Sequence, residues 1–103
     1  MPHIDYLYNS FGEWIAFRQG RNVYSPAGLW IGWLPWNDAE VVDIDGRYLG
    51  TIHEGNRLFH ELTHPGREHP DHPGYPGYPG SPGFPGFPGY ANLPPDTVDV
   101  TIA

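Results

Sequence analysis

Histidine is the residue type in this sequence with the clearest potential for chemistry. Four of the six histidines lie in one short polar segment: His60, His64, His69 and His72. Imidazole nitrogens bind Zn²⁺, Ni²⁺ and Cu²⁺, and a spacing of four residues places two side chains on one face of a helix. Pro65 and Gly66 disfavour a helix here, so the segment predicts at most weak metal binding. A polar linker enriched in histidine is the simpler interpretation.

The side chains that usually act in catalysis occur without the spacing that catalysis requires. The chain has no cysteine, and Ser10, Ser25 and Ser81 lie in no nucleophile motif. Asp43 and Asp45 are two residues apart, which places both carboxylates on one face of a strand. The sequence Asp-x-Asp-Gly is nevertheless typical of a turn. We therefore expect no catalytic residues, no enzymatic activity and no tightly bound cofactor.

Charge and composition exclude two classes of partner. The chain has 103 residues, and twelve carboxylates against five arginines give a net charge of −7. Binding to a phosphate backbone requires a basic surface, so we expect no nucleic-acid partner. No run of about 18 apolar residues is present, so we expect no membrane span. The first residues lack the basic and apolar blocks of a signal peptide, which predicts a cytoplasmic protein or export by a route that the sequence does not reveal.

Three similar stretches predict the elements that would position these residues. Each reads glycine, any residue, an aromatic residue, an aliphatic residue and then alanine or glycine. They begin at Gly12, Gly28 and Gly46, and each is followed, after a polar turn, by an apolar pair: Val23-Tyr24, Val41-Val42 and Leu58-Phe59. Each unit is therefore a predicted β-hairpin of about 16–18 residues. One hairpin cannot bury its own apolar face, so the units must pack around a common axis.

A fourth unit is predicted from the two ends of the chain. Leu7-Tyr8 precedes Gly12 as Val23-Tyr24 precedes Gly28, and it resembles the second strand of a unit whose first strand is missing. Apolar and polar residues alternate near the C-terminus, which predicts a strand with Val98, Val100 and Ile102 on one face. This strand could complete the ring in its own chain or in a neighbouring chain, and a frayed terminal segment is the alternative.

The tryptophans fall into two groups. Trp14 and Trp30 occupy equivalent positions of the repeat, so we expect them in the core or between units. Trp33 and Trp36 lie near a predicted hairpin tip, where exposed aromatic side chains could receive a proline-rich segment.

The pattern resembles the bacterial four-fold β-flower family. The segments that carry the resemblance are Tyr8-Asn9-Ser10-Phe11-Gly12-Glu13-Trp14-Ile15-Ala16, Val23-Tyr24, Gly28-Leu29-Trp30-Ile31-Gly32-Trp33 and Val42-Asp43-Ile44-Asp45-Gly46-Arg47-Tyr48-Leu49-Gly50. The resemblance covers residues 6–60 and implies short hairpins arranged around a pseudo-four-fold axis. It implies no catalytic residues and no particular activity. Residues 42–50 alone also resemble a strand pair of a PRC barrel.

A proline- and glycine-rich arm separates the repeats from the C-terminal strand. Glycine recurs at every third residue, at Gly74, Gly77, Gly80, Gly83, Gly86 and Gly89. The residues that follow these glycines are Tyr75, Tyr78, Ser81, Phe84, Phe87 and Tyr90. Proline favours polyproline II, which has three residues per turn and predicts a rod about 55 Å long with separate glycine, proline and aromatic faces. We favour packing of the arm against other chains, including a collagen-like bundle; docking on its own core and disorder are the alternatives.

These features divide the chain into a hairpin core (1–62), a histidine-rich linker (63–72), the arm (73–91) and a C-terminal strand (92–103). The predicted fold class is all-β, with repeated short hairpins around a pseudo-four-fold axis and an extended polyproline II arm. The predicted function is structural: arm and C-terminal strand join chains into a homo-oligomer, trimeric or larger, or a filament. A metal-binding protein and an adaptor whose arm is a ligand for other proteins are the alternatives.

Overall fold

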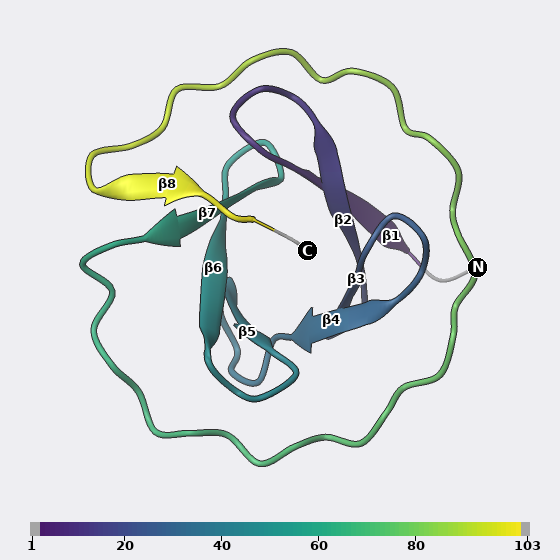
Figure 1. Ribbon diagram of the computed structural model, residues 1–103, viewed down its shortest axis with the longest axis vertical. Coiled ribbons are helices and arrows are strands. Elements are labelled where there is room, and N and C mark those ends of the chain that lie inside the picture. Colours follow the sequence, from purple (N-terminus) through teal and green to yellow (C-terminus); the bar gives the residue numbers. More distant parts are fainter. Residues whose placement is uncertain (1–2, 102–103) are drawn as a thin grey trace.

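The computed structural model describes residues 3–101, which form eight β-strands and no helix. The strands are β1 (Ile4–Tyr8), β2 (Trp14–Gln19), β3 (Asn22–Tyr24), β4 (Trp30–Trp33), β5 (Glu40–Asp43), β6 (Tyr48–His53), β7 (Arg57–Glu61) and β8 (Thr97–Asp99). Each strand pairs in antiparallel fashion with the next one along the chain. A further contact between β1 and β7 closes the sheet into a small barrel (Figure 1). The predicted all-β fold class is confirmed.

The predicted hairpins are present as β2–β3, β4–β5 and β6–β7. The pairing between successive hairpins is also repeated. Three equivalent pairs face each other, each beside an irregularity in the strand register: Tyr8 with Trp14, Tyr24 with Trp30, and Val42 with Tyr48. A bulge bends and twists a strand, so the sheet bends at three equivalent places and can close on itself.

The turns that follow β1, β3 and β5 have one construction, and we call them the first, second and third corners (residues 9–13, 25–29 and 43–47). In each, a side-chain oxygen accepts the backbone N–H four residues later: Asn9 from Glu13, Ser25 from Leu29, and Asp43 from Arg47. Gly12, Gly28 and Gly46 have φ values of 80°, 89° and 84°, a region that glycine enters without steric cost. Asp43 also accepts the N–H of Asp45 at 2.9 Å, so these carboxylates belong to a turn.

β8 belongs to a fourth unit. Val98 lies two residues after Asp96, as Trp14 lies two residues after Gly12, but it faces His60 and not Phe59, the residue equivalent to Tyr8, so this ladder lacks the irregularity of the other three. Asp96 takes the place of the corner glycine, with φ of 59°, and its carbonyl accepts the N–H of Leu62 at 2.8 Å. Residues 62–95 therefore form a long insertion in a fourth corner. The C-terminal strand pairs with β7 of its own chain, whereas Ile102 lies outside the described residues.

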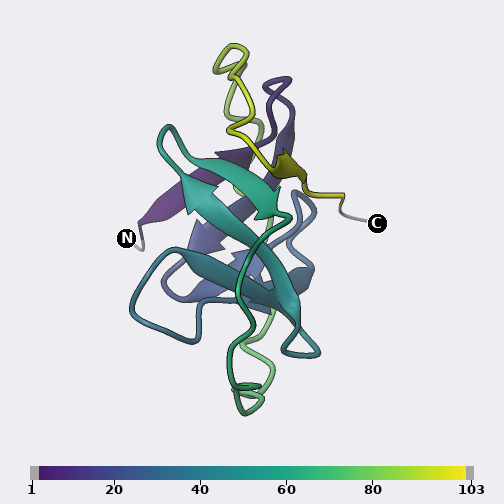
Figure 2. The same ribbon diagram turned by 90° about the vertical axis from the view of Figure 1, so that its left-hand side faces the viewer.

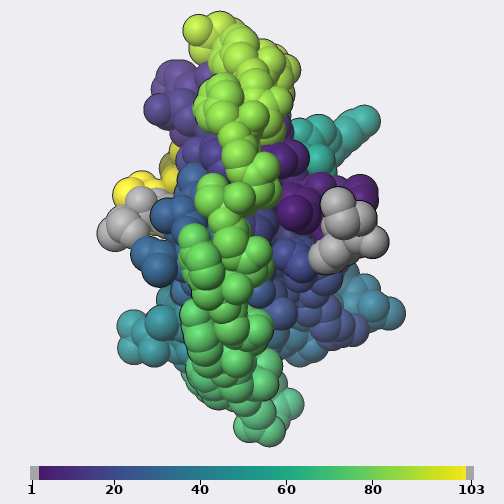
Figure 3. Space-filling view, turned by 90° about the vertical axis from the view of Figure 1, so that its right-hand side faces the viewer, coloured from purple at the N-terminus to yellow at the C-terminus, as the bar shows by residue number. Residues whose placement is uncertain are grey.

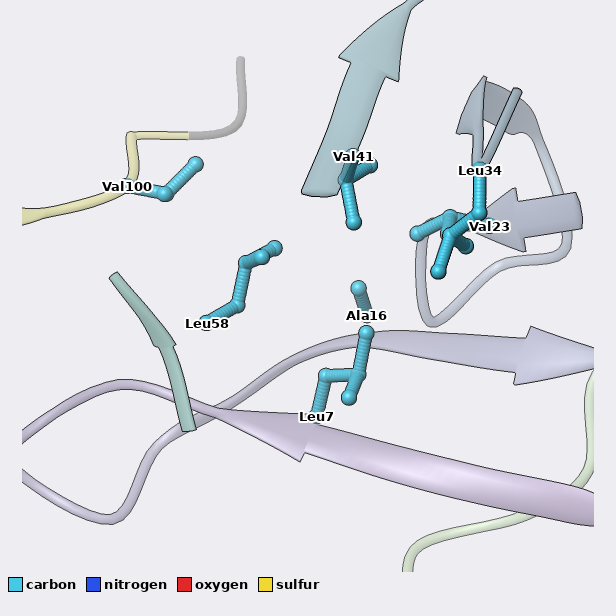
Figure 4. Close-up of a cluster of buried hydrophobic side chains, with 7 residues drawn as sticks. All are labelled: Leu7, Ala16, Val23, Leu34, Val41, Leu58 and Val100. Atoms are coloured by element: carbon cyan, nitrogen blue, oxygen red, sulfur yellow. The ribbon is translucent and has the colours of Figure 1, made fainter. Parts of the chain in front are cut away.

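The core lies inside the barrel and is built from one or two side chains of each unit. Its buried members are Leu7, Ala16, Val23, Leu34, Val41, Leu58 and Val100 (Figure 4). Val100 holds the position that Ala16, Gly32 and Gly50 hold in the other units. A Cβ on Gly50 would lie 2.8 Å from Val100 Cγ2, so one larger side chain fills the space that a glycine leaves.

The linker and the arm encircle the barrel and return to β8 (Figure 1). Figure 2 shows the segment after β7 passing outside the strands, and Figure 3 shows the arm lying as a band over the N-terminal strands. Of the arrangements considered for the arm, docking on its own core is therefore the one that the structure adopts.

The expectation of a straight polyproline II rod is wrong. Polyproline II requires φ near −75° at every residue, but the six arm glycines have φ between 84° and 94°. Proline restricts only its own φ, whereas glycine takes either sign, so the chain bends at each triplet. The bends curve the arm into a ring that fits a molecule of 34 × 34 × 24 Å, too small for a rod of about 55 Å.

Candidate functional site

The encircling segment docks on the corners at intervals of nine residues. Three pairs of a ring and a corner glycine share one arrangement: His69 on Gly46, Tyr78 on Gly28, and Phe87 on Gly12. A Cβ on Gly28 would lie 2.5 Å from Tyr78 Cε1, and one on Gly46 would lie 2.6 Å from His69 Cε1. Only glycine leaves room for the ring at these positions.

Two tryptophans hold the arm residues that lie three positions earlier. Tyr75 meets Trp30 edge to face, with ring centroids 6.0 Å apart, and Phe84 meets Trp14 in the same way at 6.1 Å. Trp14 and Trp30 begin β2 and β4, directly after the first two corners. Equivalent positions of the barrel therefore hold equivalent positions of the arm, again nine residues apart. Each such aromatic pair is worth about 0.5–1.5 kcal/mol beyond its buried area.

The tryptophans predicted to bind the arm contact the linker instead. The ring of Trp33 lies 6.0 Å from that of His72, and Trp36 lies 4.1 Å beneath the guanidinium of Arg67. The arm rests on Trp14 and Trp30 because these residues directly follow the corners along which it runs. Trp33 ends β4 and Trp36 lies in the loop beyond it, away from that path.

A few hydrogen bonds add to the aromatic contacts. At the second corner, Tyr78 Oη donates to the carbonyl of Ala27 at 3.1 Å and Ser81 Oγ donates to that of Pro26 at 2.9 Å. At the first corner, the N–H of Ala91 donates to the carbonyl of Ser10 at 2.8 Å. Ser10 and Pro26 occupy equivalent places, each two residues before a corner glycine.

Arg57 fixes the end of the arm to the barrel closure. It is buried where β7 meets Tyr8 of β1. Its Nη1 donates to the carbonyl of Asn9 at 2.8 Å, and its Nη2 donates to that of Gly89 at 3.0 Å. One planar guanidinium therefore joins β7, the first corner and the arm.

Charged side chains hold the linker where it leaves β7, and we call Asp38, Glu40, His64 and Arg67 the linker latch. His64 Nε2 lies 2.5 Å from Glu40 Oε1, and Glu40 is buried. Arg67 Nη1 lies 2.7 Å from Asp38 Oδ2 and 3.2 Å from Glu40 Oε1. The hydrogen bond from Arg67 holds the pKa of Asp38 below its ordinary value.

Tyr48 connects the latch to the third corner. Its ring stacks on His64 with centroids 3.7 Å apart, and its hydroxyl lies 2.8 Å from Thr51 Oγ1. Burial raises the pKa of Tyr48, so the phenol remains protonated near neutral pH. A hollow of about 290 Å³ lies beside these residues, and the Glu40 carboxylate in its wall is already bound by His64 and Arg67.

The four histidines considered as metal ligands have separate partners. His60 Nδ1 lies 2.9 Å from the carbonyl of Leu49, and His72 meets the ring of Trp30 at 5.2 Å. His64 binds Glu40, whereas His69 covers Gly46. Within residues 3–101, no three His, Cys, Asp or Glu side chains gather in a group that could hold a metal ion. The structure therefore does not bring these histidines together.

The outer surface of the arm is aromatic and uncharged. Its five large side chains are 62–78% exposed: Tyr75, Tyr78, Phe84, Phe87 and Tyr90. Residues 73–95 contain no Asp, Glu, Arg or His, although the whole chain carries a net charge of −7. The inner side of the arm thus contacts the corners, while much of each ring faces outward.

Together these features define an all-β barrel of four repeated units that is encircled by an insertion of its own chain. The sequence matches the family described as 4-fold beta flower protein over residues 2–99, and the chain belongs to this family. The predicted resemblance is confirmed. No curated protein and no solved structure matches the chain significantly. The described residues include no helix with the length and apolarity that a membrane crossing would need.

Sequence reasoning missed the roles of Trp14, Trp30 and Arg57 in holding the arm. A signal for the tryptophans was present, because Tyr75 and Phe84 are nine residues apart and Trp14 and Trp30 are equivalent in the repeat. No comparable signal identifies Arg57, since both of its acceptors are backbone carbonyls and any residue provides one.

Proposed function

We propose that this protein is a structural, self-associating module and that chains join through the outer surface of the arm. The observation that carries the proposal is the exposure of five large aromatic side chains along one segment. Extended apolar surface is uncommon on proteins that remain monomeric and often marks a contact with another protein. Burial of these rings against a second copy would remove apolar area from water and favour association.

The charge distribution supports the arm as the contact surface. A net charge of −7 makes copies of this chain repel each other over most of their surface. The uncharged stretch of residues 73–95 is where two copies can approach with the least repulsion. Because the arm surrounds the barrel, it offers contacts in several directions, as a closed oligomer or a filament requires.

The C-terminal strand has a smaller part in this proposal than the sequence indicated. β8 pairs with β7, and Val100 packs in the core of the same chain. Ser10 also donates to Asp99 from its N–H and its hydroxyl, at 2.7 and 2.6 Å. The strand is therefore engaged within its own barrel, and the arm alone carries the association.

Light scattering on the full chain across a concentration series tests the proposal. Tyr90 is the most exposed ring of the arm, at 78%, and its described aromatic contact is with Phe87 of the arm itself, so Tyr90→Ser removes outer surface without removing an aromatic contact with the barrel. We expect a concentration-dependent mass for the full chain and a shift of the midpoint to about tenfold higher concentration in the variant. Phe11→Ser is the matched control, because Phe11 is also exposed but does not belong to the arm.

Two results would contradict self-association through the arm. A full chain that is monomeric throughout the series rules out self-association and favours the alternative in which the arm is a ligand for another protein. An equal shift for Phe11→Ser and the arm variant places the contact elsewhere on the surface.

A further inference from the structure

The arm contains two nine-residue units that dock in the same way. They are residues 75–83, Tyr-Pro-Gly-Tyr-Pro-Gly-Ser-Pro-Gly, and residues 84–92, Phe-Pro-Gly-Phe-Pro-Gly-Tyr-Ala-Asn. In both, the first residue meets a tryptophan and the fourth covers a corner glycine. In both, the carbonyl of the sixth residue, Gly80 or Gly89, also approaches that glycine. Two similar arm units therefore dock on two equivalent corners with one geometry.

The nine-residue spacing follows from the size of the barrel. The molecule is 34 Å across in the plane of the ring. A quarter of such a circle is about 27 Å long, and nine residues can cover it, because a chain spans at most about 3.3–3.6 Å per residue. A segment that repeats with this period can therefore reach successive corners.

We propose that the first and second corners are binding sites for uncharged aromatic-Pro-Gly-aromatic-Pro-Gly segments, and that the arm of a second copy of this chain occupies them in trans. The chain's own arm is the tethered occupant in the present structure. This inference concerns the inner side of the arm and does not require the outward-facing contact proposed above.

The chemistry of the corners defines the ligand. Gly28 and Gly12 leave a flat patch of backbone on which an aromatic ring lies, and Trp30 or Trp14 meets the ring that lies three residues earlier in the ligand. All six arm glycines have φ between 84° and 94°, so a ligand that follows the same path needs glycine at these positions. The third corner holds the imidazole of His69 against Gly46, so the patch accepts a flat ring and does not depend on a hydroxyl.

Weak attachment of the arm makes exchange between copies feasible. The four docked rings, those of Tyr75, Tyr78, Phe84 and Phe87, remain largely exposed, and the described contacts include only five hydrogen bonds between residues 73–91 and the barrel. Segments with few buried apolar contacts open at low free energy. An arm that opens presents its nine-residue units to the corners of another copy, which is the usual route of segment exchange.

Binding of a labelled synthetic peptide of residues 75–92 to the full chain tests the inference. In the wild-type chain the tethered arm competes at an effective concentration in the millimolar range, so the peptide should bind weakly. The double variant Tyr78→Ser with Phe87→Ser removes both rings from the corner glycines. We expect it to bind the peptide about tenfold more tightly, with shifts in the indole NMR signals of Trp14 and Trp30.

The control peptide contains one additional Ser-Pro-Gly triplet after Gly83, so its two units are twelve residues apart. We expect about tenfold weaker binding of this peptide, because it reaches only one corner at a time. Equal affinity for both peptides, or absence of binding to the double variant, overturns the inference. If the double variant does not fold, the indole signals of the wild-type chain at millimolar peptide decide the question, and unchanged signals overturn the inference. A chain that light scattering finds monomeric would refute both the outward-facing contact and the occupation of the corners in trans, whereas an oligomer that excess peptide dissociates would support the occupation in trans.

Discussion

Replacement of one corner glycine should separate the contribution of the docked arm from that of the barrel. In Gly28→Ala, the new Cβ would lie 2.5 Å from Tyr78 Cε1 and 3.1 Å from the carbonyl oxygen of Gly80, so the arm must move away. The backbone at this position has φ of 89°, which adds a cost for any residue that has a Cβ.

Gly20→Ala is the matched control. Gly20 also has a positive φ, of 62°, but a Cβ there meets no atom within 4 Å. A left-handed conformation costs an L-residue about 1–2 kcal/mol, and this is the whole expected cost of Gly20→Ala. Gly28→Ala loses in addition the contact of the Tyr78 ring and its hydrogen bond to Ala27, together about 1–2 kcal/mol.

Urea denaturation followed by tryptophan fluorescence measures the free energy of unfolding of each variant. We expect Gly28→Ala to be less stable than Gly20→Ala by about 1–2 kcal/mol. NMR signals of the Tyr78 ring locate the effect, because they should shift in Gly28→Ala and keep their wild-type positions in Gly20→Ala. Equal stability of the two variants, with unchanged Tyr78 signals, would refute the docking of Tyr78 on this corner.

Three further predictions concern the closure, the core and the latch. Arg57→Lys keeps the charge but cannot span two carbonyls, so we expect a loss of about 1–3 kcal/mol in thermal or urea unfolding, and wild-type stability would contradict its joining role. Val100→Ala should cost about 2 kcal/mol by leaving a cavity, whereas Val98→Ala, at an exposed position, should cost less than about 0.5 kcal/mol in the same assay; equal losses would place β8 outside the core. The pKa of the Asp38 carboxyl is lowered in the folded chain, so its stabilising effect is fully present above the ordinary value of 3.8 and is lost as the pH falls through the folded value. Acid titration of Trp36 fluorescence should detect this loss, and an identical acid transition in Asp38→Asn would contradict it.

Most of the barrel could be predicted from the sequence, because its determinants are local. Gly12, Gly28 and Gly46 each follow a residue whose side chain caps a turn, and each precedes residues that favour a strand. Such signals act within a few residues and recur three times, so the repeat identified the hairpins.

The course of the arm could not be predicted in the same way. Gly77 and its equivalents accept either sign of φ, so a run of Pro-Gly triplets is compatible with a straight rod and with a ring. The choice depends on contacts with Trp14 and Trp30, which are distant in sequence. The spacing of the linker histidines likewise did not reveal their partners. His60 contacts Leu49 and His64 contacts Glu40, and both partners lie on other strands.

The insertion at the fourth corner has a consequence for the order in which the chain folds. β7 and β8 are consecutive strands separated by residues 62–96, whereas the other consecutive strands are joined by short turns or loops. Closing a loop of this length costs about 3 kcal/mol of chain entropy, and no strand pairing offsets that cost until β8 reaches β7. We therefore expect β1 to β7 to form first through local contacts, and β8 to dock last, at the rate set by the search of the long loop. The arm closes around the barrel only in that final step. Until then, the aromatic side chains of the arm are exposed to other molecules and are not yet docked on the barrel of their own chain.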